Sequence, residues 1–213
     1  MPSASNLRSK FAVVAALAAF VVASAPATSE ARSIIKDPNP PQYKVEIEPK
    51  LNLSYFGVWD YGGNAIGPGV RFSIPVMSPG FIKKINDSVA ITFGTDFLRY
   101  EGYDYRYCNR NGCFQYGSPY FWSVHFPVAM QWNFFLTDKW SVFGEVGLTV
   151  RRAFYRDEYY YNCDVRGVNC NRDRTDFWGT FFAGGRYHFN ENLALTMRLG
   201  HPVDFSIGLS IFL

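Results

Sequence analysis

The stretch that most constrains the fold of this chain is its last ten residues, Asp204 to Leu213, because they alternate between two kinds of side chain. In an extended strand, successive side chains point to opposite faces. One face would carry Phe205, Ile207, Leu209, Ile211 and Leu213, and the other Ser206, Gly208, Ser210 and Phe212. A strand with one apolar face and one mostly small or polar face is typical of the closing strand of a β-barrel in lipid, where every backbone group must be paired.

The same period of two recurs in seven earlier segments. They cover residues 43–55, 66–76, 89–100, 120–134, 140–151, 177–189 and 193–200. With the closing strand this makes eight, and an even number puts both ends of an antiparallel barrel on the same side. The sequence therefore predicts an all-β fold, an eight-stranded antiparallel up-and-down β-barrel that crosses a membrane.

The connections between these segments alternate in length. Long loops are expected near 101–119 and 152–174, and a Gly-rich turn near 60–65. The links at the other end are shorter, at 78–87, 135–139 and 190–192, while 201–203 is nearly a tight turn on the long-loop side. Short turns on the periplasmic side and longer loops outside are typical of outer-membrane barrels.

The closing strand resembles that of small Gram-negative outer-membrane barrels of the OmpA transmembrane-domain and OmpX class. In that family the last strand alternates and ends in an aromatic residue, whereas here the aromatic is Phe212 and Leu213 follows it. The resemblance implies an outer-membrane location with loops at the cell surface, in contact with outer-membrane lipid and lipopolysaccharide. It also implies that the barrel-assembly machinery recognises the C-terminal strand.

The main alternative fold is a soluble, lipocalin-like barrel, whose apolar side chains point inward. Aromatic residues make up 18% of the chain, and the interior of one eight-stranded barrel could hardly hold so many rings. Rings also gather near both ends of the segments, as membrane interfaces favour. One girdle would contain Trp59, Tyr61, Tyr100, Tyr120 and Trp122, and the other Trp132, Phe134, Trp140, Tyr187 and Phe189.

The first 31 residues have the layout of a secretory signal peptide. Arg8 and Lys10 precede an apolar run, Phe11 to Val22, and small residues follow as far as Ala31. Cleavage after Ala25, Ala27 or Ala31 would leave about 180 residues, enough for one domain. Residues 32–42 are then a Pro-rich extended lead-in and residues 43–213 the barrel. The net charge of +3 is small and suggests no nucleic-acid partner.

All four cysteines lie in the two long loops, which are also rich in tyrosine. For an exported chain we expect two local disulfides, Cys108 with Cys113 and Cys163 with Cys170, although four cysteines allow three connectivities. A metal site is less consistent with these spacings. The tyrosines could bind an external glycan, a lipopolysaccharide headgroup or a protein. They are Tyr103, Tyr105, Tyr107, Tyr159, Tyr160 and Tyr161.

The alternation also predicts which charged side chains point into the barrel. These are Glu48, Lys50, Arg71, Asp96, Glu145, Arg186 and Arg198. We expect a network of Glu48, Glu145, Arg186 and Arg198, with Arg71 and Asp96 at its margins, that fills the lumen and blocks solutes. Segment 177–189 is assigned with Arg186 inward, which allows a β-bulge near Gly184 and Gly185.

Evidence for catalysis is slight. Ser123 and His125 share one face of a strand and resemble the Ser and His of outer-membrane lipid A deacylases. However, the register points both into the barrel, and no orienting carboxylate can be assigned. The sequence favours a non-enzymatic structural or surface-binding barrel, with a narrow pore second and a lipid-modifying enzyme third. It predicts no catalytic, cofactor or metal site.

Overall fold

The computed structural model describes residues 32–37, 39–54, 64–101, 105–109, 112–116, 120–155 and 173–213. Ser33–Leu213 forms one compact unit. The predicted signal peptide, residues 1–31, lies outside the described residues. In the part of the chain that is described, no helix has the length and apolar character needed to span a bilayer.

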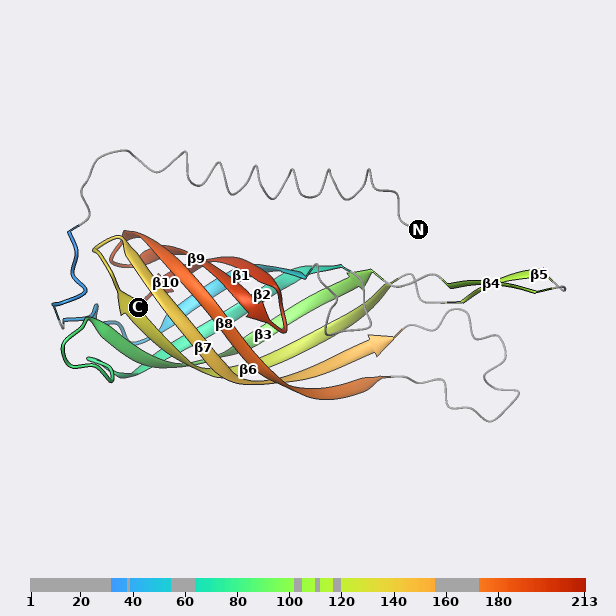
Figure 1. The fold of residues 1–213 in the computed structure, drawn as a ribbon, viewed down its shortest axis with the longest axis horizontal. Coiled ribbons are helices and arrows are strands. Elements are labelled where there is room, and N and C mark those ends of the chain that lie inside the picture. Colours follow the sequence, from blue (N-terminus) through green and yellow to red (C-terminus); the bar gives the residue numbers. More distant parts are fainter. Residues whose placement is uncertain are drawn as a thin grey trace. The chain divides into compact units, whose positions relative to one another are not determined.

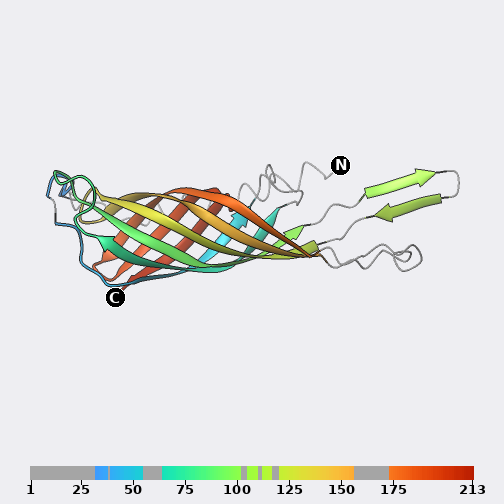
Figure 2. The same ribbon diagram turned by 90° about the horizontal axis from the view of Figure 1, so that it is seen from below.

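Eight strands form a closed antiparallel barrel (Figure 1). The predicted fold class is therefore confirmed. The strands are β1 (Glu46–Ser54), β2 (Ala65–Met77), β3 (Asp87–Glu101), β6 (Tyr120–Phe135), β7 (Trp140–Tyr155), β8 (Arg174–Asn190), β9 (Leu193–His201) and β10 (Phe205–Phe212). Their order around the barrel is β1-β10-β9-β8-β7-β6-β3-β2, and β1 pairs with β10 from Glu46↔Phe212 to Leu53↔Phe205. The strands run at a tilt to the long axis, as closure of a sheet requires (Figure 2).

The observed strands differ from the predicted segments mainly at their ends. β1 begins at Glu46 instead of residue 43, and β7 continues to Tyr155, so that the second long loop spans 156–173. The segment expected to be the first long loop contains two more strands, β4 (Tyr105–Asn109) and β5 (Gly112–Tyr116). These two pair only with each other, in a separate two-stranded sheet.

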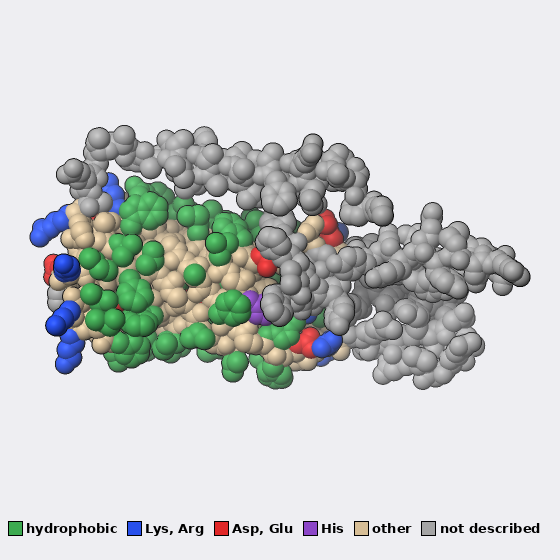
Figure 3. Space-filling model, viewed as in Figure 1, with side chains coloured by type: hydrophobic (Ala, Val, Ile, Leu, Met, Phe, Trp, Pro, Cys, Tyr) green, Lys and Arg blue, Asp and Glu red, His purple; other side chains and the backbone are tan. Residues whose placement is uncertain are grey.

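Apolar side chains cover the outside of the barrel, and polar ones fill most of its inside. On β6, for example, Trp122 and Phe126 are 48% and 49% exposed, whereas Gln131 is 0% exposed. Figure 3 shows hydrophobic side chains spread over the flank of the barrel. This arrangement is the reverse of a soluble protein's and explains why the period of two is maintained over so many strands.

One predicted strand face is wrong. Tyr100 was assigned to the girdle at the lipid boundary, but it is 2% exposed and stacks on Phe121 inside the barrel, with ring centroids 4.7 Å apart. On β3 the odd-numbered residues face outward, so an even-numbered tyrosine must face inward. The β-bulge that the inward assignment of Arg186 allowed near Gly184 and Gly185 is absent, since β7 and β8 pair without a break from Trp140↔Tyr187 to Ala153↔Arg174. The register shift in β8 lies instead between His188 and Asn190.

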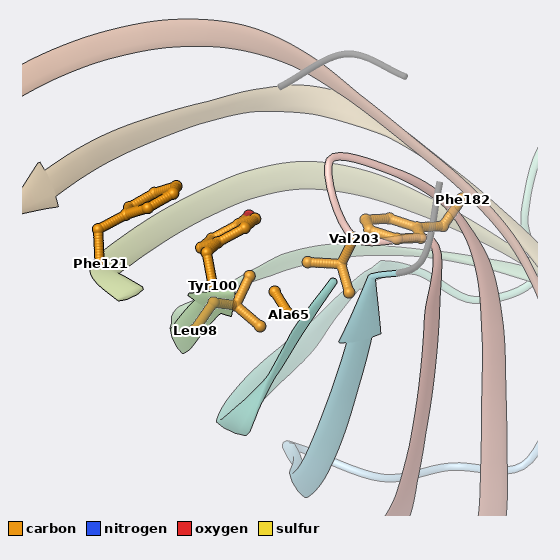
Figure 4. Packing of buried hydrophobic residues seen from close by; sticks show 6 residues of the cluster. All are labelled: Ala65, Leu98, Tyr100, Phe121, Phe182 and Val203. Atoms are coloured by element: carbon orange, nitrogen blue, oxygen red, sulfur yellow. The ribbon is translucent and has the colours of Figure 1, made fainter. Parts of the chain in front are cut away.

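The two ends of the barrel are built differently. We call the end with the start of β1 and the end of β10 the terminal end, and the opposite one the loop end. Inside the loop end is a buried apolar cluster of Ala65, Leu98, Tyr100, Phe121, Phe182 and Val203 (Figure 4). At the terminal end, the lead-in bonds to the turns of the barrel, with Ile34 N donating to Leu136 O (3.0 Å) and Asn86 N to Ile35 O (2.8 Å).

Candidate functional site

The charged interior of the barrel is the candidate site. Every strand of the barrel except β6 and β10 contributes at least one buried charged side chain from its inward face. At most 6% of each of the following residues is exposed: Glu46, Glu48, Lys50, Arg71, Asp96, Glu145, Arg186 and Arg198. The structure thus places all seven predicted lumen residues inside, together with Glu46, which the sequence analysis did not include.

Glu145 occupies the middle of the network. Its Oε1 accepts hydrogen bonds from Arg198 Nε (3.0 Å) and Gln131 Nε2 (2.7 Å), and its Oε2 accepts one from Arg71 Nη1 (3.2 Å). The Nη1 atom of Arg198 also donates a hydrogen bond to Glu48 Oε1. The Glu145 carboxylate therefore lies between the guanidinium groups of Arg71 and Arg198. The Glu48 carboxylate is the second acidic partner of Arg198. Charge-assisted bonds of this kind are among the strongest in proteins.

Toward the loop end, the network continues through Asp96. Lys50 Nζ lies 2.7 Å from Asp96 Oδ1, and Asn52 Nδ2 donates to the same oxygen at 3.0 Å. Arg71 Nη2 lies 4.0 Å from Asp96 Oδ2 while Nη1 bonds to Glu145. Arg71 was expected at the margin, but it joins the middle of the network to its loop-end part.

Toward the terminal end, Arg186 pairs with a carboxylate that was not predicted. Its Nη2 donates to both oxygens of Glu46, at 2.9 and 2.8 Å, and its Nη1 to Asn133 Oδ1 at 2.7 Å. The expected direct pairing of Arg186 with Glu48 or Glu145 is not present among the described contacts. The link to Glu145 runs through Gln131, which accepts from Arg186 (3.1 Å) and donates to Glu145 (2.7 Å).

An aromatic ring lies inside this charged region. The guanidinium carbons of Arg186 and Arg198 are 4.4 and 4.8 Å from the centroid of the Phe143 ring, within the range of cation–π contacts. Gly184 leaves the space that the ring fills, because a Cβ there would be 2.1 Å from Phe143 Cζ. Sequence reasoning missed Phe143, although its odd number gives it the same inward orientation as Glu145.

Tyr43 packs at the terminal end of the network, just before β1. Its ring meets that of Phe212 edge-on, with centroids 5.0 Å apart. Burial, together with the negative charge of Glu46, raises the pKa of Tyr43 to about 12. The hydroxyl therefore stays neutral across the physiological range and adds no charge to the network.

Ser123 and His125 form a hydrogen-bonded pair nearer the loop end. Ser123 Oγ and His125 Nε2 are 2.9 Å apart, and both residues are buried inside the barrel. The other ring nitrogen, Nδ1, which a catalytic acid would have to bind, has no hydrogen-bond partner among the described residues. No described residue therefore serves as the third group that a nucleophilic triad needs. The described residues also contain no group of three or more metal-ligating side chains.

The predicted loop residues are only partly described. Cys108 and Cys113 are direct partners across the β4–β5 pair, and Tyr105 and Tyr107 lie on β4. Tyr103, Tyr159, Tyr160, Tyr161, Cys163 and Cys170 lie outside the described residues.

The closed sheet of eight strands defines the class of protein by fold: a small antiparallel up-and-down β-barrel, the fold of small outer-membrane barrels. No protein-family model matches the sequence, and no curated protein matches it. Similar solved structures include the outer membrane protein OprG from Pseudomonas aeruginosa, at 10% identity and a TM-score of 0.47 over 80% of this chain and 90% of that one.

Two further solved structures are similar to this chain. Ail of Yersinia pestis, solved in complex with the heparin analogue sucrose octasulfate, is 10% identical, with a TM-score of 0.43 over 79% of this chain and 95% of that one. The N-terminal β-barrel domain of Pseudomonas aeruginosa OprF is 14% identical, with a TM-score of 0.37 over 80% of this chain and 97% of that one. At these values the similarity concerns the fold alone.

Proposed function

We propose that this protein is a non-enzymatic outer-membrane barrel whose lumen is closed by its charged network and whose long loops bind ligands at the cell surface. The observation that carries the proposal is the inversion of the barrel, with exposed apolar side chains outside and paired charges inside. In water this outer surface would be an extensive apolar patch, whereas in lipid it is the surface that a barrel requires.

The lengths of the connections support an orientation. At the terminal end, β6 joins β7 and β8 joins β9 by links of a few residues, and at the loop end β3 joins β6 and β7 joins β8 by long ones. Outer-membrane barrels have short periplasmic turns and long external loops. The terminal end therefore faces the periplasm and the loop end the outside of the cell.

A gel experiment tests the membrane barrel directly. Protein extracted from membranes should migrate differently in SDS with and without boiling, because a closed barrel resists the detergent until it is heated. Identical migration, together with solubility in the absence of detergent, would contradict the proposal and favour a soluble barrel.

The contacts of the network support a closed lumen. Glu145, on β7, bonds to Arg71 on β2 and Arg198 on β9, and neither strand is a neighbour of β7 in the sheet. Such contacts must cross the interior, which in an eight-stranded barrel is only wide enough for side chains. In planar lipid bilayers the purified protein should therefore give little or no steady conductance, and large, stable channels would contradict a closed lumen.

A narrow pore is the second candidate, and one observation favours it. Several buried polar atoms of the interior have no hydrogen-bond partner in the described part of the protein, among them Glu48 Oε2, Arg71 Nε and Thr149 Oγ1. Buried polar atoms usually have partners, and water can serve where protein groups do not. Small, selective currents that change when Arg71 is replaced would support this alternative.

Binding by the loops rests on their chemistry. Tyrosine and arginine provide adaptable contact surfaces, and Tyr105 and Tyr107 lie on a β-hairpin, which is a more ordered support than an irregular loop. A variant without residues 102–119 and 156–172 should keep its heat-dependent migration but lose binding to lipopolysaccharide or to surface glycans on an array. Equal binding by both proteins would reduce the function to that of a structural barrel.

A further inference from the structure

The link between β2 and β3, at the terminal end, is an ordered structure built around one carboxylate. Asp87 Oδ2 accepts hydrogen bonds from the backbone N–H of Ile82 (3.2 Å) and from Trp132 Nε1 (2.8 Å). Gly80 N donates to the backbone oxygen of Asp87 (2.8 Å), and a Cβ at Gly80 would be 2.6 Å from Asp87 Oδ2. The path of this link is therefore fixed by its own bonds and by the need for glycine at one position.

This ordered link exposes apolar side chains next to the lipid-facing surface. Phe81 and Ile82 are 53% and 41% exposed. The Phe81 ring meets Trp132 edge-on at 5.4 Å, and Trp132 lies 4.8 Å from Phe134, which belongs to the aromatic residues at this end of the barrel. The apolar surface of the barrel thus continues into the link instead of stopping where β2 ends.

Two exposed lysines, Lys83 and Lys84, follow immediately. Both lysines lie in a turn that is closed by a backbone hydrogen bond from Ile85 N to Ile82 O (3.1 Å). Three more lysines, Lys36 and Lys44 on the lead-in and Lys139 after β6, are at the same end. Three acidic residues, Asp37, Asp138 and Glu191, also lie there. In Figure 3 the lysine and arginine side chains at this end border the hydrophobic surface.

We infer that the segment Gly80–Lys84, here called the inner anchor, is a binding site for an anionic phospholipid. Phe81 and Ile82 enter the acyl region beside Trp132, and the ammonium groups of Lys83 and Lys84 bind the headgroup phosphate. Aromatic residues at the lipid boundary with lysines just outside it are the arrangement that attracts anionic lipid. The inference rests on the proposed membrane orientation, since it assigns the site to the periplasmic leaflet.

The test compares two lipids that differ in headgroup charge. The full-length protein, purified in detergent, is mixed with equal amounts of phosphatidylglycerol and phosphatidylcholine of the same chain length, and bound lipid is counted by native mass spectrometry. The wild type should retain more phosphatidylglycerol. In K83Q/K84Q the ratio of phosphatidylglycerol to phosphatidylcholine should fall at least about fivefold, the effect of one lysine near an anionic surface.

Two variants serve as controls. R152Q/R174Q removes the same charge from the half-exposed Arg152 and the exposed Arg174 at the loop end and should leave the ratio unchanged. F81S/I82S should lower the retention of both lipids and keep the preference. An excess of glycerol phosphate tests whether the site binds a lipid or only a free phosphate. A site that binds the headgroup alone would release its lipid, whereas a site that also binds the acyl chains would keep it.

Specific outcomes would overturn the inference. They are an unchanged ratio in K83Q/K84Q, an equal fall in R152Q/R174Q, or displacement of the lipid by glycerol phosphate. Each sample is also run on a gel with and without boiling. If the wild type shows a normal heat shift but no preference for phosphatidylglycerol, only the inner anchor is rejected. If the wild type shows no heat shift, the membrane barrel itself is rejected.

Discussion

Arg198 donates a hydrogen bond from Nε to Glu145 Oε1 across 3.0 Å, although the two residues belong to strands that do not pair in the sheet. Arg198 lies on β9 and Glu145 on β7, with β8 between them. The contact therefore joins parts of the wall that share no backbone hydrogen bonds. In this barrel, paired charges in the lumen join strands that are not neighbours, a role that an apolar core has in a soluble domain.

This role of Glu145 gives the first prediction. Glu145→Ala leaves Arg198 and Arg71 buried without the carboxylate that they share, and breaking a buried pair from one side costs about 3–5 kcal/mol. The free energy of unfolding, measured by urea titration in a fixed detergent or vesicle system, should fall by about that amount. Glu191→Ala, at the exposed β8–β9 turn, is the control and should change it by less than about 0.5 kcal/mol. Equal effects of the two substitutions would show that the network does not stabilise the barrel.

The sequence was sufficient for the fold because a period of two fixes which face of a strand each residue occupies. It placed Glu48, Glu145 and Arg198 inside, and the structure brings these three together. The period does not give the position of an inward residue along the barrel axis, because that position depends on strand tilt and register. That is why the partner of Arg186 was not found: Glu46 lies one inward position before Glu48 and at the level of Arg186.

Two other differences have a local cause. β4 and β5 lie within a stretch of alternating tyrosine and polar residues that was assigned to a long loop, and they form a hairpin outside the closed barrel. Phe143 was overlooked because an apolar residue on the polar face breaks the pattern. Its place becomes clear only when Gly184, on the neighbouring strand, is seen to leave room for the ring.

The second prediction concerns the pair of Glu46 and Arg186. Each single variant, Glu46→Gln or Arg186→Gln, leaves one buried charge without its partner, whereas the double variant leaves none. The double variant should therefore lose less stability than the sum of the two single losses, with a coupling energy of about 1–3 kcal/mol in a urea double-mutant cycle. The half-exposed pair of Arg152 and Asp173, 3.1 Å apart, should show a coupling below about 1 kcal/mol. Additive losses at Glu46 and Arg186 would mean that the two side chains act independently.

The third prediction concerns the cysteines. The backbones of Cys108 and Cys113 are directly opposite across an antiparallel pair, a placement whose Cα separation suits a disulfide. Peptide mapping under non-reducing conditions should recover Cys108 joined to Cys113, and Cys163 joined to Cys170. A link between Cys108 and Cys163 would contradict local pairing. Cys108→Ser should leave the heat-dependent migration of the barrel unchanged, because β4 and β5 form no hydrogen bonds within the closed sheet.

The fourth prediction uses two glycines of the same region that differ in the face they occupy. Gly184 faces the interior, and a Cβ there would be 2.1 Å from the Phe143 ring and 2.7 Å from the backbone oxygen of Met197. The ring cannot move away freely, because the guanidinium groups of Arg186 and Arg198 lie 4.4 and 4.8 Å from its centroid. Gly184→Ala should therefore overpack the lumen and lower the free energy of unfolding by about 1–3 kcal/mol.

Gly144 provides the matched control, since nothing lies within 4 Å of the Cβ that alanine would add there. Gly144→Ala should be neutral or stabilise by up to about 1 kcal/mol, because alanine restricts the unfolded chain more than glycine does. Both variants are unfolded in urea under the same conditions and followed by tryptophan fluorescence. Replacing Phe143 with Leu in the Gly184→Ala background should restore part of the lost stability, since the smaller side chain makes room for the new methyl group. If Gly184→Ala is as stable as Gly144→Ala, the lumen is not packed tightly around Phe143.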